Sequence, residues 1–107
     1  MKLVTKEIER EFKKYPLGSQ DGKGDDALVI LKVFNPYGSQ TWLITEAEKD
    51  GDDWYCFGCA NLFGFWEWGY ISINELANTK VNVFGFKMGL ERDMYCKGKT
   101  VRDLKEV

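Results

Sequence analysis

A strand, a proline turn and a second strand at residues 27–46 constrain the fold more than any other part of this chain. ALVILKVF at 27–34 is rich in β-branched residues and nearly apolar on both faces, which is typical of a strand inside a sheet. NPYG at 35–38 has proline at the second position of a turn, so QTWLITE at 40–46 is expected to return antiparallel. These segments predict an antiparallel sheet.

Further strands are expected to extend this sheet. The acidic connection EAEKDGDD at 46–53 leads into WYCFGCA at 54–60, and WEWGYISI at 66–73 has the composition of another strand. LERDMYC at 90–96 is predicted to be the last strand. The intervening NTKVNVFGFKMG at 78–89, which makes up most of the long 77–88 connection, is interpreted as a loop with some extended structure.

The first helix is predicted over residues 6–14. Thr5 can cap its start, apolar side chains recur at intervals of three and four, and Pro16 ends it. The following segment, LGSQDGKGDD at 17–26, has the glycine and aspartate content of a mobile loop.

Two more helix starts are marked by capping patterns. Ser72 and Glu75 stand in capping-box spacing before a short helix through Leu76, and Thr100 with Asp103 forms a weaker cap for a final helical turn or two. The chain is therefore predicted to be one α+β domain over 1–107. It should contain a mostly antiparallel sheet of four to five strands, with an N-terminal helix and one or two short helices packed on one face.

Charge and length exclude several classes of function. Fifteen basic and seventeen acidic side chains give a net charge of −2, which disfavours direct nucleic-acid binding. The purely apolar run at 28–31 is far shorter than the roughly 20 residues that span a bilayer. The start, MKLVTKEIEREFKK, is too charged for a signal peptide. We expect a cytoplasmic protein that does not enter membranes.

The three cysteines include a CxxC at Cys56 and Cys59. Strand positions three apart point to opposite faces, so these thiols share a metal only if Gly58 breaks the strand. The chain has no histidine to complete a zinc site. We favour buried reduced thiols over a metal or redox site, and we expect no cofactor.

Four segments resemble the family of the domain of unknown function 2958, which is carried on bacterial plasmids, conjugative elements and phages. They are KLVTKEI at 2–8, TWLITE at 41–46, WEWGYISINEL at 66–76 and GLERDMY at 89–95. The resemblance brings no known activity. It implies the context of a mobile genetic element, whose accessory genes serve transfer, regulation, or evasion of host restriction and CRISPR systems.

The candidate binding residues are aromatic or charged side chains of the predicted strands. If 90–96 is a strand, Arg92 lies among apolar neighbours and needs a carboxylate partner, for which Glu46 and Glu67 are the candidates. The set is Trp42, Glu46, Glu67, Trp68, Tyr70, Glu91, Arg92 and Asp93.

The aromatic run FWEWGY allows two interpretations. Alternation places Trp68 and Tyr70 on the face opposite Ile71, beside Trp42 or Trp54. The rings either form a second small core closed by the 77–88 connection, or remain partly exposed and anchor a protein interface.

These patterns favour a non-enzymatic, protein-binding accessory factor of a mobile element. Two alternatives stay open. The acidic segments 21–26 and 46–53 could imitate nucleic-acid phosphates and inhibit a host defence nuclease. A cluster of Glu46, Glu67, Glu91 and Asp93 with Arg92 could instead serve a small enzyme or ligand binder. The partner and the oligomeric state are left open.

Overall fold

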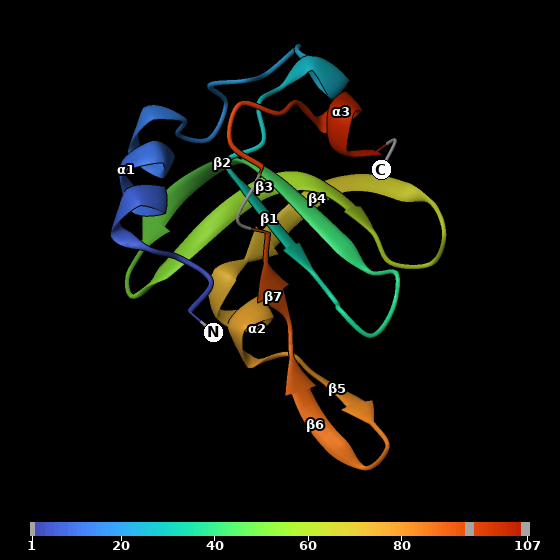
Figure 1. Cartoon of the computed structure of the whole chain (residues 1–107). Helices are drawn as coiled ribbons and strands as arrows, with labels where there is room; N and C mark the ends of the chain where they lie inside the picture. Colours follow the sequence, from blue (N-terminus) through green and yellow to red (C-terminus); the bar gives the residue numbers. More distant parts are fainter. Residues whose placement is uncertain (1, 94–95, 106–107) are drawn as a thin grey trace.

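The computed structural model describes residues 2–93 and 96–105. Within this part of the chain the main sheet has the strand order β4-β3-β2-β1-β7, and every neighbouring pair is antiparallel (Figure 1). Its strands are β1 (Leu31–Phe34), β2 (Thr41–Asp50), β3 (Asp53–Asn61), β4 (Trp66–Ser72) and β7 (Glu91–Arg92). With the helices described below, this confirms the predicted α+β class and the mostly antiparallel five-stranded sheet.

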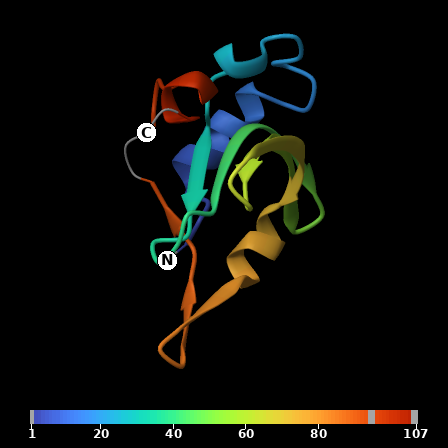
Figure 2. The same cartoon turned by 90° about the vertical axis from the view of Figure 1, so that its right-hand side faces the viewer.

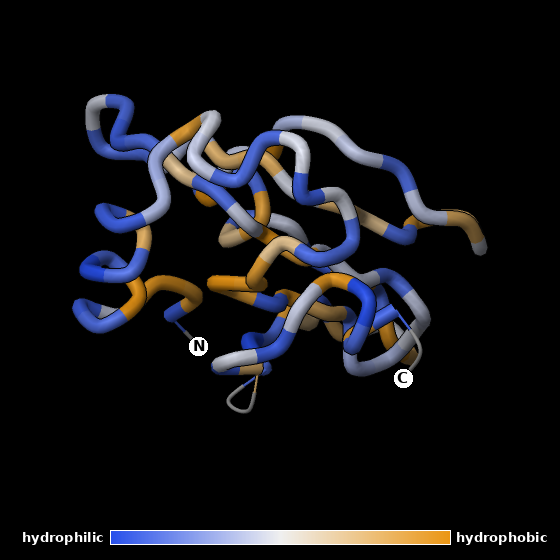
Figure 3. Tube along the Cα trace, turned by 90° about the horizontal axis from the view of Figure 1, so that it is seen from above, coloured by the Kyte–Doolittle hydropathy of each residue, from blue (hydrophilic) through white to orange (hydrophobic). Residues whose placement is uncertain are grey.

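Helices α1 (Lys6–Lys14) and α2 (Ile73–Asn78) begin where the sequence predicts. The Thr5 hydroxyl accepts a hydrogen bond from the Ile8 N–H at 3.2 Å, and the Ser72 hydroxyl accepts one from the Glu75 N–H at 3.2 Å. Each bond satisfies a backbone donor that has no partner inside its helix. Figure 3 shows α1 with hydrophilic residues on its outer side and hydrophobic residues toward the sheet.

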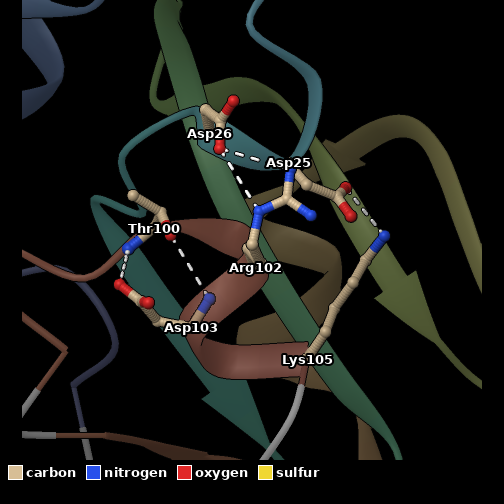
Figure 4. Close-up of polar contacts among 6 residues, drawn as sticks. All are labelled: Asp25, Asp26, Thr100, Arg102, Asp103 and Lys105. Carbon is tan, nitrogen blue, oxygen red and sulfur yellow. Dashed lines mark hydrogen bonds and ion pairs between the residues drawn. The ribbon is translucent and has the colours of Figure 1, made fainter.

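Helix α3 (Val101–Lys105) has a reciprocal cap (Figure 4). The Thr100 hydroxyl accepts from the Asp103 N–H at 3.2 Å, and the Asp103 carboxylate accepts from the Thr100 N–H at 3.0 Å. No helix in the described part of the chain is long and apolar enough to cross a membrane.

Buried apolar side chains lie on both faces of the main sheet. On one face, which we call the α1 face, Ile44 and Cys56 pack with Phe12 of α1 and Leu76 of α2. On the other, the α3 face, the packed residues include Leu43, Cys59, Val101 and Leu104. The prediction that all helices cover one face is therefore wrong, because α3 returns over the second face.

Two predicted connections contain strand. Strand β2 continues to Asp50 and the turn is confined to residues 51 and 52, so most of the predicted connection 46–53 belongs to the β2–β3 hairpin. The 77–88 connection, with Gly89, forms a separate hairpin of β5 (Lys80–Val83) and β6 (Phe86–Gly89), which projects from the body in Figures 1 and 2.

Two predicted strands are shorter than expected. The 27–34 segment is regular strand over β1, which has neighbours on both sides as predicted, while Leu28 makes an isolated bridge to Thr100. The 90–96 segment pairs as strand at β7, and its residues 94 and 95 lie outside the described residues.

The 17–26 loop, which ends in the 3₁₀ turn η1 (Gly24–Asp26), is anchored by one buried side chain. The Gln20 amide nitrogen donates to the carbonyls of Leu28 and Thr45 at 2.9 and 2.8 Å, and its oxygen accepts from the Leu28 N–H at 2.7 Å. The 17–26 segment therefore has the composition of a mobile loop, but hydrogen bonds fix it to the sheet.

A β-bulge at Thr45 changes which side chains of β2 lie on the α1 face and which lie on the α3 face. Ile44 lies opposite Gly58, but Glu46 lies opposite Phe57, so one residue is inserted between them. After the bulge Ala47 is on the α1 face, and Glu46 is on the α3 face. Simple alternation along 40–46 would place Glu46 on the face of Trp42 and Ile44, and the inserted residue moves it to the other face.

Gly58 and Gly69 lie opposite each other in β3 and β4 but differ in surroundings. A Cβ atom at Gly58 would lie 2.1 Å from the Leu43 carbonyl oxygen, whereas one at Gly69 would meet no atom within 4 Å. We expect Gly58→Ala to lower the free energy of unfolding by about 2–3 kcal/mol through overpacking. Gly69→Ala should raise it by about 0.5 kcal/mol, because glycine disfavours strand interiors. Urea unfolding of both variants tests this, and equal effects would contradict it.

Candidate functional site

Aromatic side chains from β3 and β4 form a row on the α3 face. Phe57 lies opposite Tyr70, with ring centroids 5.2 Å apart. Phe57 also stacks on Trp68 at 5.7 Å, and Tyr70 stacks on Tyr55 at 5.1 Å. We call these four residues the aromatic row. Such contacts fix the rings relative to one another, so the row presents a preformed surface.

The aromatic row is largely open to solvent. Trp68 is 39% exposed and Tyr70 is 63% exposed. The prediction that both lie on the face opposite Ile71 is confirmed, but Trp42 and Trp54 pack with the core of the α1 face and are not their neighbours. The hairpin within 77–88 projects from the body and does not enclose the rings, so the interpretation of a closed second core is wrong.

Helix α3 covers one end of the row and is held there by ion pairs (Figure 4). Lys105 pairs with Asp25 at 2.9 Å, and Arg102 pairs with Asp26 at 3.2 Å. The Lys105 ammonium also lies 5.8 Å from the ring centroids of Trp66 and Trp68. The Lys105 ammonium is therefore within cation–π distance of both tryptophan rings while it pairs with Asp25.

Carboxylates flank the other side of the row. After the bulge, Glu46, Glu48 and Asp50 alternate along β2 on the α3 face, beside Phe57 and Tyr55. Glu48 and Asp50 are exposed and give the aromatic row an acidic border, whereas Glu46 is buried.

Asp53, at the end of the same face, is tied to the start of α2. Its carboxylate accepts from the Ser72 hydroxyl at 2.5 Å and from the Asn74 N–H at 2.9 Å. Burial acts to raise the pKa of Asp53, but the bonds from Ser72, Asn74 and the Trp54 N–H lower that pKa below its usual range. Asp53 therefore remains ionised at neutral pH.

A pocket of about 250 Å³ opens on the α1 face, at the same edge of the sheet. Its lining includes α1-face positions of β2, β3 and β4, namely Trp42, Gly58, Ala60, Glu67, Gly69 and Ile71. The β3–β4 loop adds the exposed side chains of Phe63 and Phe65 to the rim. We call it the Trp42 pocket; its walls are apolar and Glu67 is the acidic residue in its lining.

The comparisons with known proteins identify a family and no activity. A family model described as "Protein of unknown function (DUF2958)" matches residues 3–102. The chain belongs to this family. No curated protein and no solved structure matches it. The range matched by the DUF2958 model includes the whole aromatic row and the whole Trp42 pocket.

In this DUF2958 protein the predicted site residues are divided between the two edges of the sheet. Trp42 and Glu67 line the Trp42 pocket on the α1 face, and Trp68 and Tyr70 belong to the aromatic row on the other face of β4, whereas Glu91 and Arg92 form β7 at the opposite edge. The strand order separates Glu67 from Arg92, so the predicted pairing of these two residues is wrong.

The charged residues at the β7 edge contact neighbouring segments of the fold. The Arg92 guanidinium donates to the main-chain carbonyls of Lys2 and Leu3, which holds the N-terminal segment against the sheet. Asp93 forms an ion pair with Lys32 at 3.4 Å. The cluster on which the enzyme hypothesis depended is therefore not assembled.

Glu46 is buried, at 3% exposure, and its two oxygens bind the 17–26 loop. Oε1 accepts from the Gly18 N–H at 2.7 Å and Oε2 from the Gln20 N–H at 3.0 Å. The expected pairing of Glu46 with Arg92 is therefore replaced by bonds to backbone amides. Sequence inspection missed Gln20, whose only signal is a long polar side chain in a glycine-rich loop.

The Glu46 contacts give a direct stability test. We expect Glu46→Ala to lower the free energy of unfolding by about 2–3 kcal/mol, because it leaves the loop amides without their charged acceptor. Glu48→Ala, at an exposed position two residues along the same strand, should change it by less than about 0.5 kcal/mol. Urea unfolding compares the two variants, and a smaller loss in Glu46→Ala than in Glu48→Ala would refute the assignment.

The cysteines of the CxxC lie on opposite faces of β3, as alternation predicts. Cys56 packs in the core of the α1 face and Cys59 in that of the α3 face. Burial raises the pKa of the Cys56 thiol to about 12 and also raises the pKa of Cys59. Within residues 2–93 and 96–105, no group of three or more histidine, cysteine or acidic residues could hold a metal ion.

The buried thiols should be unreactive in the folded protein. A raised pKa leaves little thiolate at pH 8, and burial blocks access, so iodoacetamide should modify Cys56 and Cys59 only after denaturation. Mass spectrometry of peptides from native and denatured samples measures this. Elemental analysis should find no stoichiometric zinc. Rapid native labelling, or a zinc ion lost in a Cys56→Ser, Cys59→Ser variant, would overturn the interpretation.

Proposed function

We propose that this chain is a non-enzymatic, protein-binding accessory factor of a mobile genetic element, and that it binds its partner through the aromatic row. The single observation that supports this most is the solvent exposure of stacked rings on the α3 face, where α3 covers one end of the row. Tryptophan and tyrosine of this kind supply much of the binding energy at protein interfaces. The mobile-element context follows the resemblance carried by the four sequence segments.

The border of the row favours a protein over a nucleic acid. Aromatic rings on a sheet also stack on bases of single strands, but such surfaces combine the rings with basic side chains. Here Glu48 and Asp50 stand beside the row, and the net charge of the whole chain is −2. These carboxylates would repel a phosphate backbone and attract a basic protein surface.

The same carboxylates support a second candidate function, inhibition of a host defence nuclease by acidic mimicry. Glu48 and Asp50 are two residues apart on one strand, which spaces their backbone positions by about 6.5–7 Å. Mimicry predicts binding that weakens strongly between low and moderate salt, because exposed charges would then carry the affinity. Binding carried by the aromatic row should change little over the same range.

The test is capture of partners from the native host by the tagged chain, followed by affinity measurement with the identified partner. We expect Trp68→Ala and Tyr70→Ala to stay folded and to weaken binding by at least ~2 kcal/mol each, as for hot-spot aromatics. The matched control is Phe86→Ala, which removes an exposed ring of the β5–β6 hairpin. Undiminished binding in both row variants would reject the proposal.

A further inference from the structure

The outer edge of β4 is open and regular. Within residues 2–93 and 96–105, no backbone hydrogen bond joins β4 to a segment other than β3 and its own neighbours in the chain. Its pairing with β3 shows no register shift over seven residues, and Glu67 is its one charged residue. Protein edges of this length are normally protected by lysine, proline or a bulge, because an open edge recruits another strand.

Gly69 lies in the middle of this edge without a structural reason for glycine. Its φ is not in the left-handed region, and an added Cβ would meet no atom within 4 Å. Glycine inside a strand costs stability, and it often marks a place where a ligand or another backbone approaches closely. At Gly69 the space that a side chain would fill belongs to the Trp42 pocket.

A strand added to β4 would contact the Trp42 pocket on one face of the sheet and the aromatic row on the other. Its side chains alternate, so one set would lie beside Glu67 and the Trp42 pocket and the other beside Trp68 and Tyr70. The Glu67 carboxylate has no hydrogen-bond or ion-pair partner among the described residues. A basic side chain at the facing position would supply one.

We propose that β4 accepts an extended segment of the partner protein by antiparallel or parallel strand addition. An arginine or lysine of that segment pairs with Glu67, and the apolar side chain two residues away, on the same face, enters the Trp42 pocket above Gly69. This inference rests on the proposed function and names the class of partner.

A second copy of the chain fits this edge less well. Antiparallel pairing of two β4 strands centred on Gly69 places each Glu67 opposite Ile71 and leaves both carboxylates without a cation. Pairing centred on Glu67 places two like charges opposite each other, which is destabilising. Charge complementarity therefore favours a basic segment from another protein.

The first test uses two blocked octapeptides, Arg-Thr-Val-Thr-Arg-Thr-Val-Thr and Glu-Thr-Val-Thr-Glu-Thr-Val-Thr, in which charged and valine side chains alternate along one face of the strand and can face Glu67 and Gly69 together. The arginine peptide should bind at least tenfold more tightly in NMR titration and should slow exchange of outward β4 amides at least tenfold. Equal binding of both peptides, or binding without amide protection, would overturn the proposal. Concentration-dependent protection without peptide would make the occupant a second copy and would also overturn it.

Variants of β4 then separate the pocket from the aromatic row. Gly69→Leu places a side chain in the pocket at a position where a Cβ atom meets no atom within 4 Å, and it should weaken binding of the arginine peptide at least tenfold, while Glu67→Lys should reverse the preference between the peptides. Phe86→Ala, on the distant hairpin, is the control and should change neither. If the host partner is lost with Trp68→Ala but unaffected by Gly69→Leu and Glu67→Lys, strand addition fails and the proposed function stands. If Trp68→Ala and Tyr70→Ala have no effect, the proposed function fails.

Discussion

The bulge at Thr45 decides how the two faces of the sheet are composed. It is accompanied by a close approach of β2 to β3, which leaves no room for a side chain at Gly58. Without the inserted residue, simple alternation would place Glu46 on the α1 face and Ala47 on the α3 face. With it, Ala47 enters the core, Glu46 reaches the 17–26 loop, and the exposed carboxylates of β2 stand beside the aromatic row.

The surface around β4 depends on this arrangement. Glu46 and Gln20 fix the loop that carries Asp25, and Asp25 holds Lys105 of α3 over Trp68. Helix α3 therefore covers one end of the aromatic row and leaves the other end open. On the opposite face, the facing glycines of β3 and β4 form part of the Trp42 pocket. One edge strand thus presents a flat aromatic face, an apolar pocket and an unpaired backbone.

Local features could be predicted from the sequence because their causes are local. The caps at Thr5, Ser72 and Thr100 each join atoms three residues apart, so the residue types reveal them. The two sides of β4 and the opposite directions of Cys56 and Cys59 follow from strand alternation. The pairing of Arg92 with Glu67 was predicted wrongly because it required the strand order, which alternation does not contain.

The sequence by itself determined the α+β class, the β1–β2 hairpin, the helix starts and the family, since these depend on residue type, spacing and short-range bonds. The tertiary structure decided where α3 packs, which edge of the sheet is open, and which carboxylates serve structure. Glu46 and Glu67 are both glutamates of predicted strands, yet one is buried against loop amides and the other lines an open pocket. That difference arises from hydrogen bonds between segments more than 25 residues apart in the chain. Local residue patterns do not reveal such contacts.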